Sequence, residues 1–557
     1  MHSVISVLIS HIPFSGLPLA AKSFVRDATG LVREISFLDH LVTNMNGVVP
    51  FAALALTPWW IWFAVPGGDP LVATALGFFF SVVGSIVSYA MLSATFPRSA
   101  APYVATSRVL HPAIGWPAEA LMWVGWILAL ALYPSFMFTW GLTPGLYTMG
   151  ISTGNPALVA AAVALTQPVW QIVVGTVFML ICLVVTVMGT KRLVRTFQLP
   201  MTIIMFIGIA VIVVVWLGAS TQQLSAVLPT YLGSNETAIL SYAKTNYAPA
   251  FTPFSLAPIP ILFSLGFTAG SFNTYWNAYA SGEVRRANEA KTHLLAMIIP
   301  SALIAIMVFL VLGAAKFTVG NDILVAINQI LSNNASYFSI PAITGFSGSI
   351  TLILVPMMLA NNPVLQFIIM ASAVAATFCY VPATMLILSR ECFAWSFDRL
   401  LPSAFSNVSD RFHTPLISIG VNWIVGVIVF VIFTLYASYL GFFTTAAWDT
   451  TLVTVAVLCL AAALLPLRKS LWSVSPVNRY KIAGIPVISI GGILGFFYNG
   501  LAVYAFTFTP ILGFGLPSTL VLVGTFIVPF ILYWIIKAVR KSQGIDIDMI
   551  FRSIPPE

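Results

Sequence analysis

The amino-acid sequence predicts an all-α integral membrane protein that crosses the bilayer twelve times. Of its 557 residues, 59% are hydrophobic and 7% are charged, whereas a soluble protein has about 45–50% apolar and about 25% charged residues. Twelve apolar runs are each long enough to span the hydrocarbon core, which takes roughly 20 residues of helix. Nearly all basic residues fall on one side of the topology that these runs imply. A β-barrel is excluded, because the runs at 171–189 and 202–218 do not alternate between apolar and polar positions.

The predicted spans cover residues 38–64, 70–94, 113–147, 169–189, 197–219, 257–281, 293–315, 364–390, 415–437, 447–467, 485–508 and 516–538. The run at 350–360 is too short to cross and is predicted to be an interfacial helix in a long loop. The resulting segments are a tail at 1–36, five spans over 37–220, an outer loop at 221–256, five spans over 257–467 with a second outer loop at about 316–363, two spans over 468–540 and a tail at 541–557.

The basic residues indicate how the chain is oriented. An even number of spans places both termini on one side, and 22 of the 24 Lys and Arg residues fall on segments of that side. Only Lys244 and Lys316 fall on the other. Because cytoplasmic loops carry the excess of Lys and Arg, we expect a multi-pass protein of the plasma membrane with both termini in the cytoplasm. The net charge of +8 is then this bias, and no nucleic-acid surface is predicted.

The sequence predicts neither a cofactor nor a metal site. Its four cysteines lie in or beside apolar runs, where we expect them to be reduced packing residues. The six histidines show no pair at metal-ligand spacing, and no nucleotide loop or nucleophile motif is present. The first 24 residues lack the features of a signal peptide and are expected to stay on the chain as a tail. An enzyme is therefore not expected.

Two of the predicted spans are interrupted near their middle. The first contains Asn44, Asn46, Gly47 and Pro50; the sixth contains Ser264, Gly266, Thr268, Gly270, Ser271 and Asn273. An unwound backbone is tolerated in a membrane where it lines a cavity, and breaks five spans apart are typical of inverted-repeat transporters. The exposed N–H and carbonyl groups of such breaks suit a zwitterion. The alternative is that glycine and proline serve helix packing here.

Four segments between the apolar runs carry recognisable patterns. After the eighth run come Ser389 and Arg390, then FAWSFDRLLP at 393–402 and the pair Thr414-Pro415. The others are GEVRRAN at 282–288, FPRSAAPY at 96–103 and the stretch from Arg479 to Pro486. Over about residues 33–540 the sequence thereby resembles the permeases of the amino acid, polyamine and organocation (APC) superfamily.

This resemblance implies a LeuT-like fold. Spans one to five and six to ten would form inverted repeats around a mid-membrane site, with spans eleven and twelve peripheral. Carried over by position, the substrate-binding residues are Asn46, Gly47, Val48, Val49, Phe267, Thr268, Ala269, Gly270 and Ser271. The first span departs from the family's glycine-rich pattern, since NGVVP at 46–50 has a single glycine. Whether Gly266 or Gly270 marks the unwound point of the sixth span is open, and we expect it within Thr268 to Ser271.

The sequence also offers candidates for coupling and gating. Sodium-coupled relatives are expected to carry two adjacent hydroxyl residues on span eight, which ASAVAAT at 371–377 lacks. The intramembrane acids Glu119 and Asp449 are the coupling candidates, because a charge at mid-membrane costs at least about 2.5 kcal/mol. Alternatively, Glu119 is hydrated near the inner surface and Asp449 occupies a helix start. Residues that could gate the site, or simply pack, are Trp116, Trp123, Trp126, Tyr380 and Trp448.

The sequence therefore favours a secondary transporter that moves an amino acid or related small amine across the plasma membrane by alternating access, with proton coupling or exchange. Its partners would be this small-molecule substrate and the lipid bilayer. Two alternatives remain, a sodium-coupled symporter of another small solute and a sensor that binds without transporting. A membrane enzyme is disfavoured, because only isolated acids lie within the spans.

Overall fold

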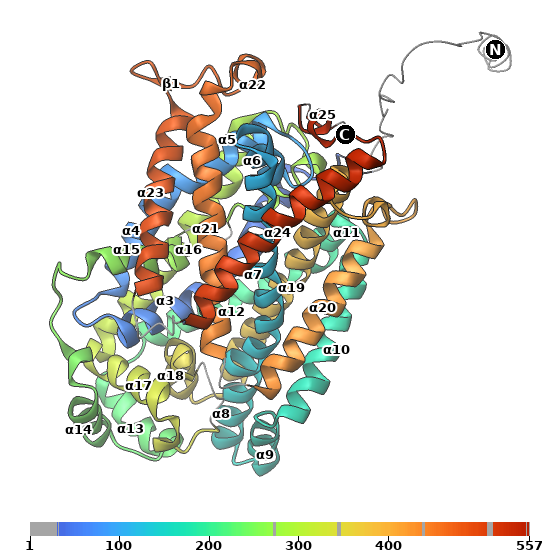
Figure 1. Cartoon of the computed structure of the whole chain (residues 1–557). Coiled ribbons are helices and arrows are strands. Elements are labelled where there is room, and N and C mark those ends of the chain that lie inside the picture. Colours follow the sequence, from blue (N-terminus) through green and yellow to red (C-terminus); the bar gives the residue numbers. More distant parts are fainter. Residues whose placement is uncertain are drawn as a thin grey trace, which may run out of the picture.

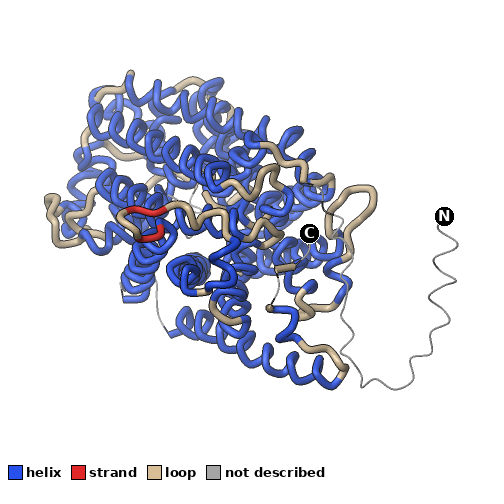
Figure 2. Tube along the Cα trace, turned by 90° about the horizontal axis from the view of Figure 1, so that it is seen from above, coloured by secondary structure: helices blue, strands red, loops and turns tan. Residues whose placement is uncertain are grey.

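The structure, a computed structural model, describes residues 31, 33–270, 274–341, 347–436, 440–508, 516–552 and 554–555. These residues are almost entirely helical, and helix axes run side by side through the molecule (Figures 1 and 2). Eleven helical segments among them are long and apolar enough to cross a membrane. Ten of the predicted spans thus appear as long continuous or nearly continuous helices, and the first and sixth need separate description.

The first repeat contains five predicted spans. The first is split into α2 (Phe37–Val48) and α3 (Pro50–Ala64). The second joins α4 (Pro70–Phe80) to α5 (Val87–Thr95) through a π-helical turn, and the third joins α7 (Pro112–Phe136) to α8 (Thr143–Thr153) in the same way. The short α6 (Ala101–Val109) precedes α7, and α9 (Pro156–Ala164) follows α8. The fourth and fifth are α10 (Pro168–Val187) and α12 (Leu199–Leu217), the latter preceded by α11 (Thr190–Arg192).

The second repeat begins with a short helix, α15 (Ile259–Gly270), followed by 3-10 turns at Trp276–Ala278 and Ser281–Glu283. Its other spans are α16 (Ala290–Val319), α19 (Pro363–Phe397), α20 (Leu416–Leu435) and α21 (Leu440–Leu464). After α22 (Lys469–Val474), strands β1 (Lys481–Ile482) and β2 (Ile485–Pro486) form an antiparallel hairpin. The last helices are α23 (Val487–Phe508), α24 (Leu516–Ser542) and α25 (Ile547–Phe551).

Different helices and strands form the two ends of the bundle. At one end, here named the termini face, lie α22, the β1–β2 hairpin and α25 (Figure 1). The opposite face carries α13 (Thr221–Leu232), α14 (Glu236–Asn246) and α17 (Asn321–Asn333). Helix α18 (Thr351–Ala360) was predicted to be interfacial, but its residues from Leu352 to Met358 are buried against α12, α13 and α19. The segment is therefore covered by two spans and a loop helix, and its position at the membrane interface stays a prediction.

Helices α4 and α15 approach closely at two glycines. A Cβ atom on Gly77 would lie 1.9 Å from the carbonyl oxygen of Gly266, and a Cβ on Gly266 would lie 1.9 Å from the carbonyl oxygen of Ala73. Small residues permit such backbone contact between membrane helices. Gly266 therefore lies inside α15 as a packing residue, and the helix continues to Gly270 before it ends.

Candidate functional site

A cavity lies between the broken first span and three long helices. Its walls are almost wholly apolar and come from α3, α7, α19 and α21: Leu56, Gly125, Trp126, Ala129, Leu132, Tyr133, Phe136, Tyr380, Ala447, Trp448 and Thr451. A water-sized sphere can occupy about 20 Å³ between them, and all the empty space among their atoms, including the open mouth, amounts to about 390 Å³. Clefts that are mostly apolar and carry few polar groups are typical small-molecule sites.

The aromatic walls of this cavity are fixed by ring contacts. Tyr133 and Tyr380 stack with their ring centroids 3.4 Å apart, and Trp276 packs against Tyr380 at 4.7 Å. Trp448 meets Trp60 of α3 edge to face at 4.9 Å. The rings hold one another in place, so the cavity is shaped by rigid groups with little rotamer freedom.

Three of the five aromatic gate candidates, Trp126, Tyr380 and Trp448, line this cavity. The other two do not. Trp116 packs against Trp395, with ring centroids 6.3 Å apart, and the Trp123 indole donates to Asn422 Oδ1 at 2.9 Å. These two contribute helix packing, as the alternative interpretation held.

The first predicted set of substrate-binding residues lies at the junction of α2 and α3. Val49 separates the helices with φ 50° and ψ 93°, and Pro50 begins α3. Asn46 is buried; its Oδ1 accepts a hydrogen bond from Thr202 Oγ1 at 2.7 Å, while its Nδ2 has no partner. Gly47 is buried beside it, and the Val48 side chain lies outside the described residues. Asn46, Gly47 and Val49, which the structure describes in full, do not belong to the cavity wall.

The second predicted set lies at the end of α15. The backbone of Phe267, Thr268, Ala269 and Gly270 is helical, but their side chains lie outside the described residues, as does Ser271 altogether. That these five residues bind the substrate therefore stays a prediction.

A buried polar chain joins the two broken spans. Asn44 Oδ1 accepts from the backbone N–H of Asn277 at 2.8 Å, and Asn44 Nδ2 donates to the Ala296 carbonyl at 2.9 Å. Asn277 Nδ2 lies 2.6 Å from His40 Nδ1, and His40 Nε2 lies 3.1 Å from His293 Nδ1. Because His293 Nε2 lies 2.8 Å from the Ala287 carbonyl, a pair of neutral imidazoles satisfies every contact, each donating through Nε2.

The coupling candidate Glu119 lies in a second polar cluster, nearer the termini face. It is 0% exposed, so the interpretation of a hydrated side chain is wrong. Tyr279 Oη donates to Glu119 Oε2 at 3.0 Å, and the carboxyl group of Glu391 from α19 lies near enough to interact electrostatically with that of Glu119. Glu391 is also 0% exposed. The Tyr279 ring packs on Trp126 with centroids 4.6 Å apart, which joins this cluster to the cavity wall.

The other candidate, Asp449, is buried within α21. It follows the cavity residue Trp448 and is 1% exposed, and neither of its carboxylate oxygens has a hydrogen-bond partner. Because α21 begins at Leu440, Asp449 lies in the third turn and the predicted helix-start position is wrong.

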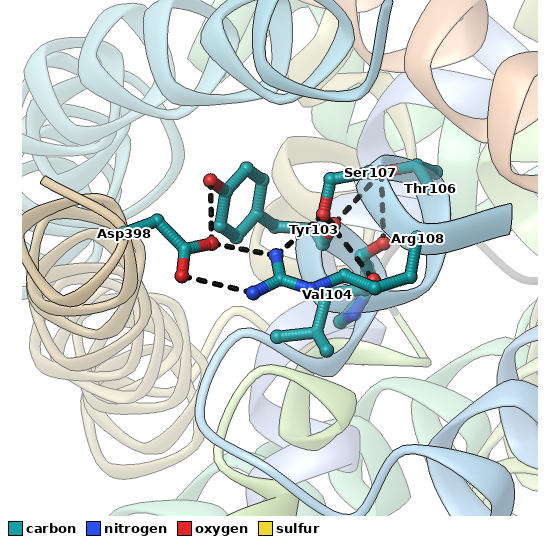
Figure 3. A network of polar contacts seen from close by, with 7 residues as sticks. Tyr103, Val104, Thr106, Ser107, Arg108 and Asp398 are labelled. Atoms are coloured by element: carbon teal, nitrogen blue, oxygen red, sulfur yellow. Dashed lines mark hydrogen bonds and ion pairs between the residues drawn. The ribbon is translucent and has the colours of Figure 1, made fainter. Parts of the chain in front are cut away.

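Ion pairs lie between the cavity and the termini face. Arg108 and Asp398 form two contacts, Nη1 to Oδ2 at 2.5 Å and Nη2 to Oδ1 at 2.9 Å, and Tyr103 Oη donates to Asp398 Oδ2 at 2.9 Å (Figure 3). Arg390 Nε donates to Glu283 Oε1 at 2.7 Å. Arg195, which lies between α11 and α12, contacts Asp39 in the first turn of α2 at 2.9 Å. The Arg108–Asp398 pair joins the two repeats, whereas each of the other two pairs lies within one repeat.

Sequence reasoning missed several members of these clusters. Glu391 lies beside the resemblance-bearing Ser389 and Arg390, and Asn277 follows the sixth break. His40 and His293 belong to the histidines that were judged scattered, although their rings meet in the structure. Within the described residues, no group of three or more His, Cys, Asp or Glu side chains could hold a metal.

Comparison with known proteins agrees with this architecture. A family model described as amino acid permease matches residues 42–536. No curated protein matches the chain. Among solved structures, that of MhsT in complex with L-phenylalanine is similar, with a TM-score of 0.52 and 13% identity over 85% of this chain and 98% of that one. This likeness shows the LeuT-like fold, with two inverted repeats of five helices and two further helices.

The family match covers most of the chain, and the fold is that of a membrane transporter of amino acids or related solutes. The protein therefore belongs to the amino acid permease family, within the amino acid, polyamine and organocation superfamily.

Proposed function

We propose that this protein carries an amino acid with a bulky apolar side chain, or a related small amine, across the plasma membrane by alternating access. The observation that carries the proposal is the aromatic cavity of Trp126, Tyr133, Tyr380 and Trp448. Such walls favour an apolar or aromatic substrate group, because burial contributes roughly 25 cal/mol per Å² of apolar surface. The similar transporter MhsT holds L-phenylalanine, which supports this substrate class.

The polar end of the substrate would bind at the breaks. The backbone between α2 and α3 is unwound at Val49, and the buried Nδ2 of Asn46 lacks an acceptor. A substrate carboxylate would supply that acceptor, and carbonyl groups at the end of α15 would accept from an ammonium. On this proposal the predicted contacts are Asn46 to Val49 and Phe267 to Ser271.

The proposed orientation places the termini face in the cytoplasm. Arg98, Arg108 and Arg468 lie at this face, whereas Lys244 is in α14 and Lys316 is in the last turn of α16, at the opposite end. This distribution supports cytoplasmic termini, because positive residues are retained on the inside.

For coupling, we propose a proton or obligatory exchange, with Glu119 and Asp449 as the candidate acids. Sodium has less support, because the turn of α19 at 371–377 lacks two adjacent hydroxyl residues. Its hydroxyls, Ser372 and Thr377, donate to the carbonyls of Met205 and Val374, both at 2.7 Å.

The test is uptake of labelled L-phenylalanine into proteoliposomes. Ala129→Trp would fill the cavity, and we expect at least about a tenfold loss of uptake with unchanged elution in detergent. Gly313→Trp is the matched control, because a Cβ at Gly313 meets nothing within 4 Å. Ala269→Trp tests the contact predicted for the sixth span, and normal uptake by that variant would refute it.

Two further outcomes separate the alternatives. Binding without counterflow of labelled substrate would identify a sensor. Normal uptake by Ala129→Trp would show that the cavity does not hold the substrate, and the proposal would fail.

A further inference from the structure

Two acidic side chains meet inside the protein without a cation between them. Glu119 comes from the second turn of α7 and Glu391 from near the end of α19, and both are 0% exposed. Their carboxyl groups lie near enough to interact electrostatically. Three of their four oxygens, Glu119 Oε1 and both oxygens of Glu391, have no donor, and the fourth accepts from Tyr279 Oη.

Within the described residues, no ion pair joins a Lys, Arg or His to either carboxyl group. Three cations on adjoining elements are paired elsewhere: Arg108 of α6 with Asp398, Arg390 of α19 with Glu283, and Lys537 of α24 with Asp548. Helices α10, α20 and α21 contain neither Lys nor Arg. The titratable groups that face the pair are uncharged ones, Tyr89, Tyr279 and the Cys392 thiol.

One shared proton would reduce the repulsion between the two acids and supply a hydrogen-bond donor that their oxygens lack. Two carboxylates in contact in a low-dielectric interior repel strongly, and neither can then donate a hydrogen bond. With one proton, a carboxylic acid donates to its neighbour and the pair carries one charge in place of two. The burial and the missing donors therefore fit a protonated pair.

We propose that Glu119 and Glu391 share one proton and form the proton-binding site of this transporter, with Tyr279 as the residue that joins the site to the substrate cavity. The inference rests on the proposed transport function and deepens it. Asp449, which stands alone, is then not the coupling acid.

Tyr279 has the contacts that this role requires. Its hydroxyl donates to Glu119, its ring packs on the cavity residue Trp126, and its carbonyl accepts from the Ala100 N–H at 2.7 Å. The segment after the sixth break is thereby attached to the pair. Loss of the proton places two charges beside Tyr279, which favours a conformation that admits water to the carboxyl groups.

The proton balance over one cycle is simple. A proton from water on the outer side forms the O–H bond of one carboxyl group when the site is open to that side. After the change in access, that O–H bond breaks and the proton passes to water on the cytoplasmic side. One proton moves with one substrate, and no oxidant or reductant is involved.

The test compares driven accumulation with exchange in proteoliposomes whose membrane potential is clamped. With a pH difference of about one unit, coupling of one proton per substrate permits up to about tenfold accumulation of labelled L-phenylalanine. We expect wild type and the surface control Asp322→Asn to approach that value. Glu391→Gln and Glu119→Gln should accumulate no more than onefold while retaining counterflow exchange. Tenfold accumulation by Glu391→Gln, or loss of accumulation in Asp449→Asn alone, would overturn the proposal.

A second measurement does not depend on transport. The infrared difference spectrum between wild type and Glu391→Gln at neutral pH should show the carbonyl band of a buried protonated carboxyl group in wild type. Coincident spectra in this region would overturn the shared proton. If wild type exchanges no amino acid, the proposed function fails, and the infrared result still decides the protonation of the pair.

Discussion

Removal of Asp398 should destabilise this protein far more than removal of a surface carboxylate. In the Asp398→Ala variant the Arg108 guanidinium loses contacts of 2.5 and 2.9 Å, and Tyr103 Oη loses its acceptor. The Arg108 and Asp398 side chains are 2% and 1% exposed, so water cannot replace the lost partner. Breaking such a buried pair costs about 3–5 kcal/mol in the free energy of unfolding.

The charge on Arg108 does not depend on pH in the range of the assay. Burial lowers the pKa of Arg108, but its contacts with Asp398 outweigh this and raise the pKa above its usual value. Because the pKa of Arg108 is raised in the folded protein, the stability that its charge contributes is fully present at any pH below the pKa of this residue in the unfolded chain. The cost of Asp398→Ala should therefore be the same at about pH 6 and at about pH 8.

The assay is unfolding in mixed detergent micelles, followed by intrinsic fluorescence. The matched control is Asp322→Ala, which breaks an ion pair with Lys244 at 2.9 Å. The Asp322 side chain is 59% exposed and the Lys244 side chain 52%. This substitution should lower the free energy of unfolding by at most about 1 kcal/mol. The double variant Arg108→Met with Asp398→Leu should regain most of the loss. Equal costs for Asp398→Ala and Asp322→Ala would refute the reasoning.

Two further predictions concern packing and the histidine pair. Gly77→Ala places a methyl group against the Gly266 carbonyl and should lower the free energy of unfolding by about 1–3 kcal/mol in the same assay. The control Gly313→Ala, which has open space around it, should be neutral or stabilising. Equal effects of the two substitutions would contradict the close contact. His293→Leu leaves His40 Nε2 without an acceptor and should cost about 1–3 kcal/mol, and an unchanged unfolding midpoint would show that the chain of contacts contributes nothing.

Hydropathy predicted the fold because the membrane imposes it. A segment such as 293–315 must be helical in lipid, since its backbone groups have no other hydrogen-bond partners. The structure extends this segment to Ala290–Val319, a difference confined to its ends, where aqueous loops begin. The sixth span was the exception: in the described residues α15 covers Ile259–Gly270 and the chain from Trp276 to Ala278 is a 3-10 turn, so the span is longer in residues than as a helix.

The polar clusters could not be predicted in the same way, because they depend on which helices cross. Glu119 and Glu391 are separated by 272 positions, and no pattern around either one indicates the other. The alternative interpretation of Glu119, that it is hydrated, rested on its closeness to the inner surface. In the structure, α6 and α24 pack against α7, and this covering buries it. Asp449 was misplaced for a simpler reason, since α21 extends further toward the opposite face than the apolar run suggested.

The contacts between the broken spans indicate how they would move. Asn44 holds the backbone N–H of Asn277 and the carbonyl of Ala296, so the last turns of α2 are attached to the segment after α15 and to α16. The Ile35 N–H donates to the Glu283 carbonyl at 2.9 Å, and the Arg285 N–H donates to the Ile35 carbonyl at 3.0 Å. Because these contacts bind α2 to the turns after the sixth break, the two segments would leave their present position together. Glu283 in turn holds Arg390, the neighbour of Glu391, and so the same movement would disturb the carboxyl pair that we propose to carry the proton.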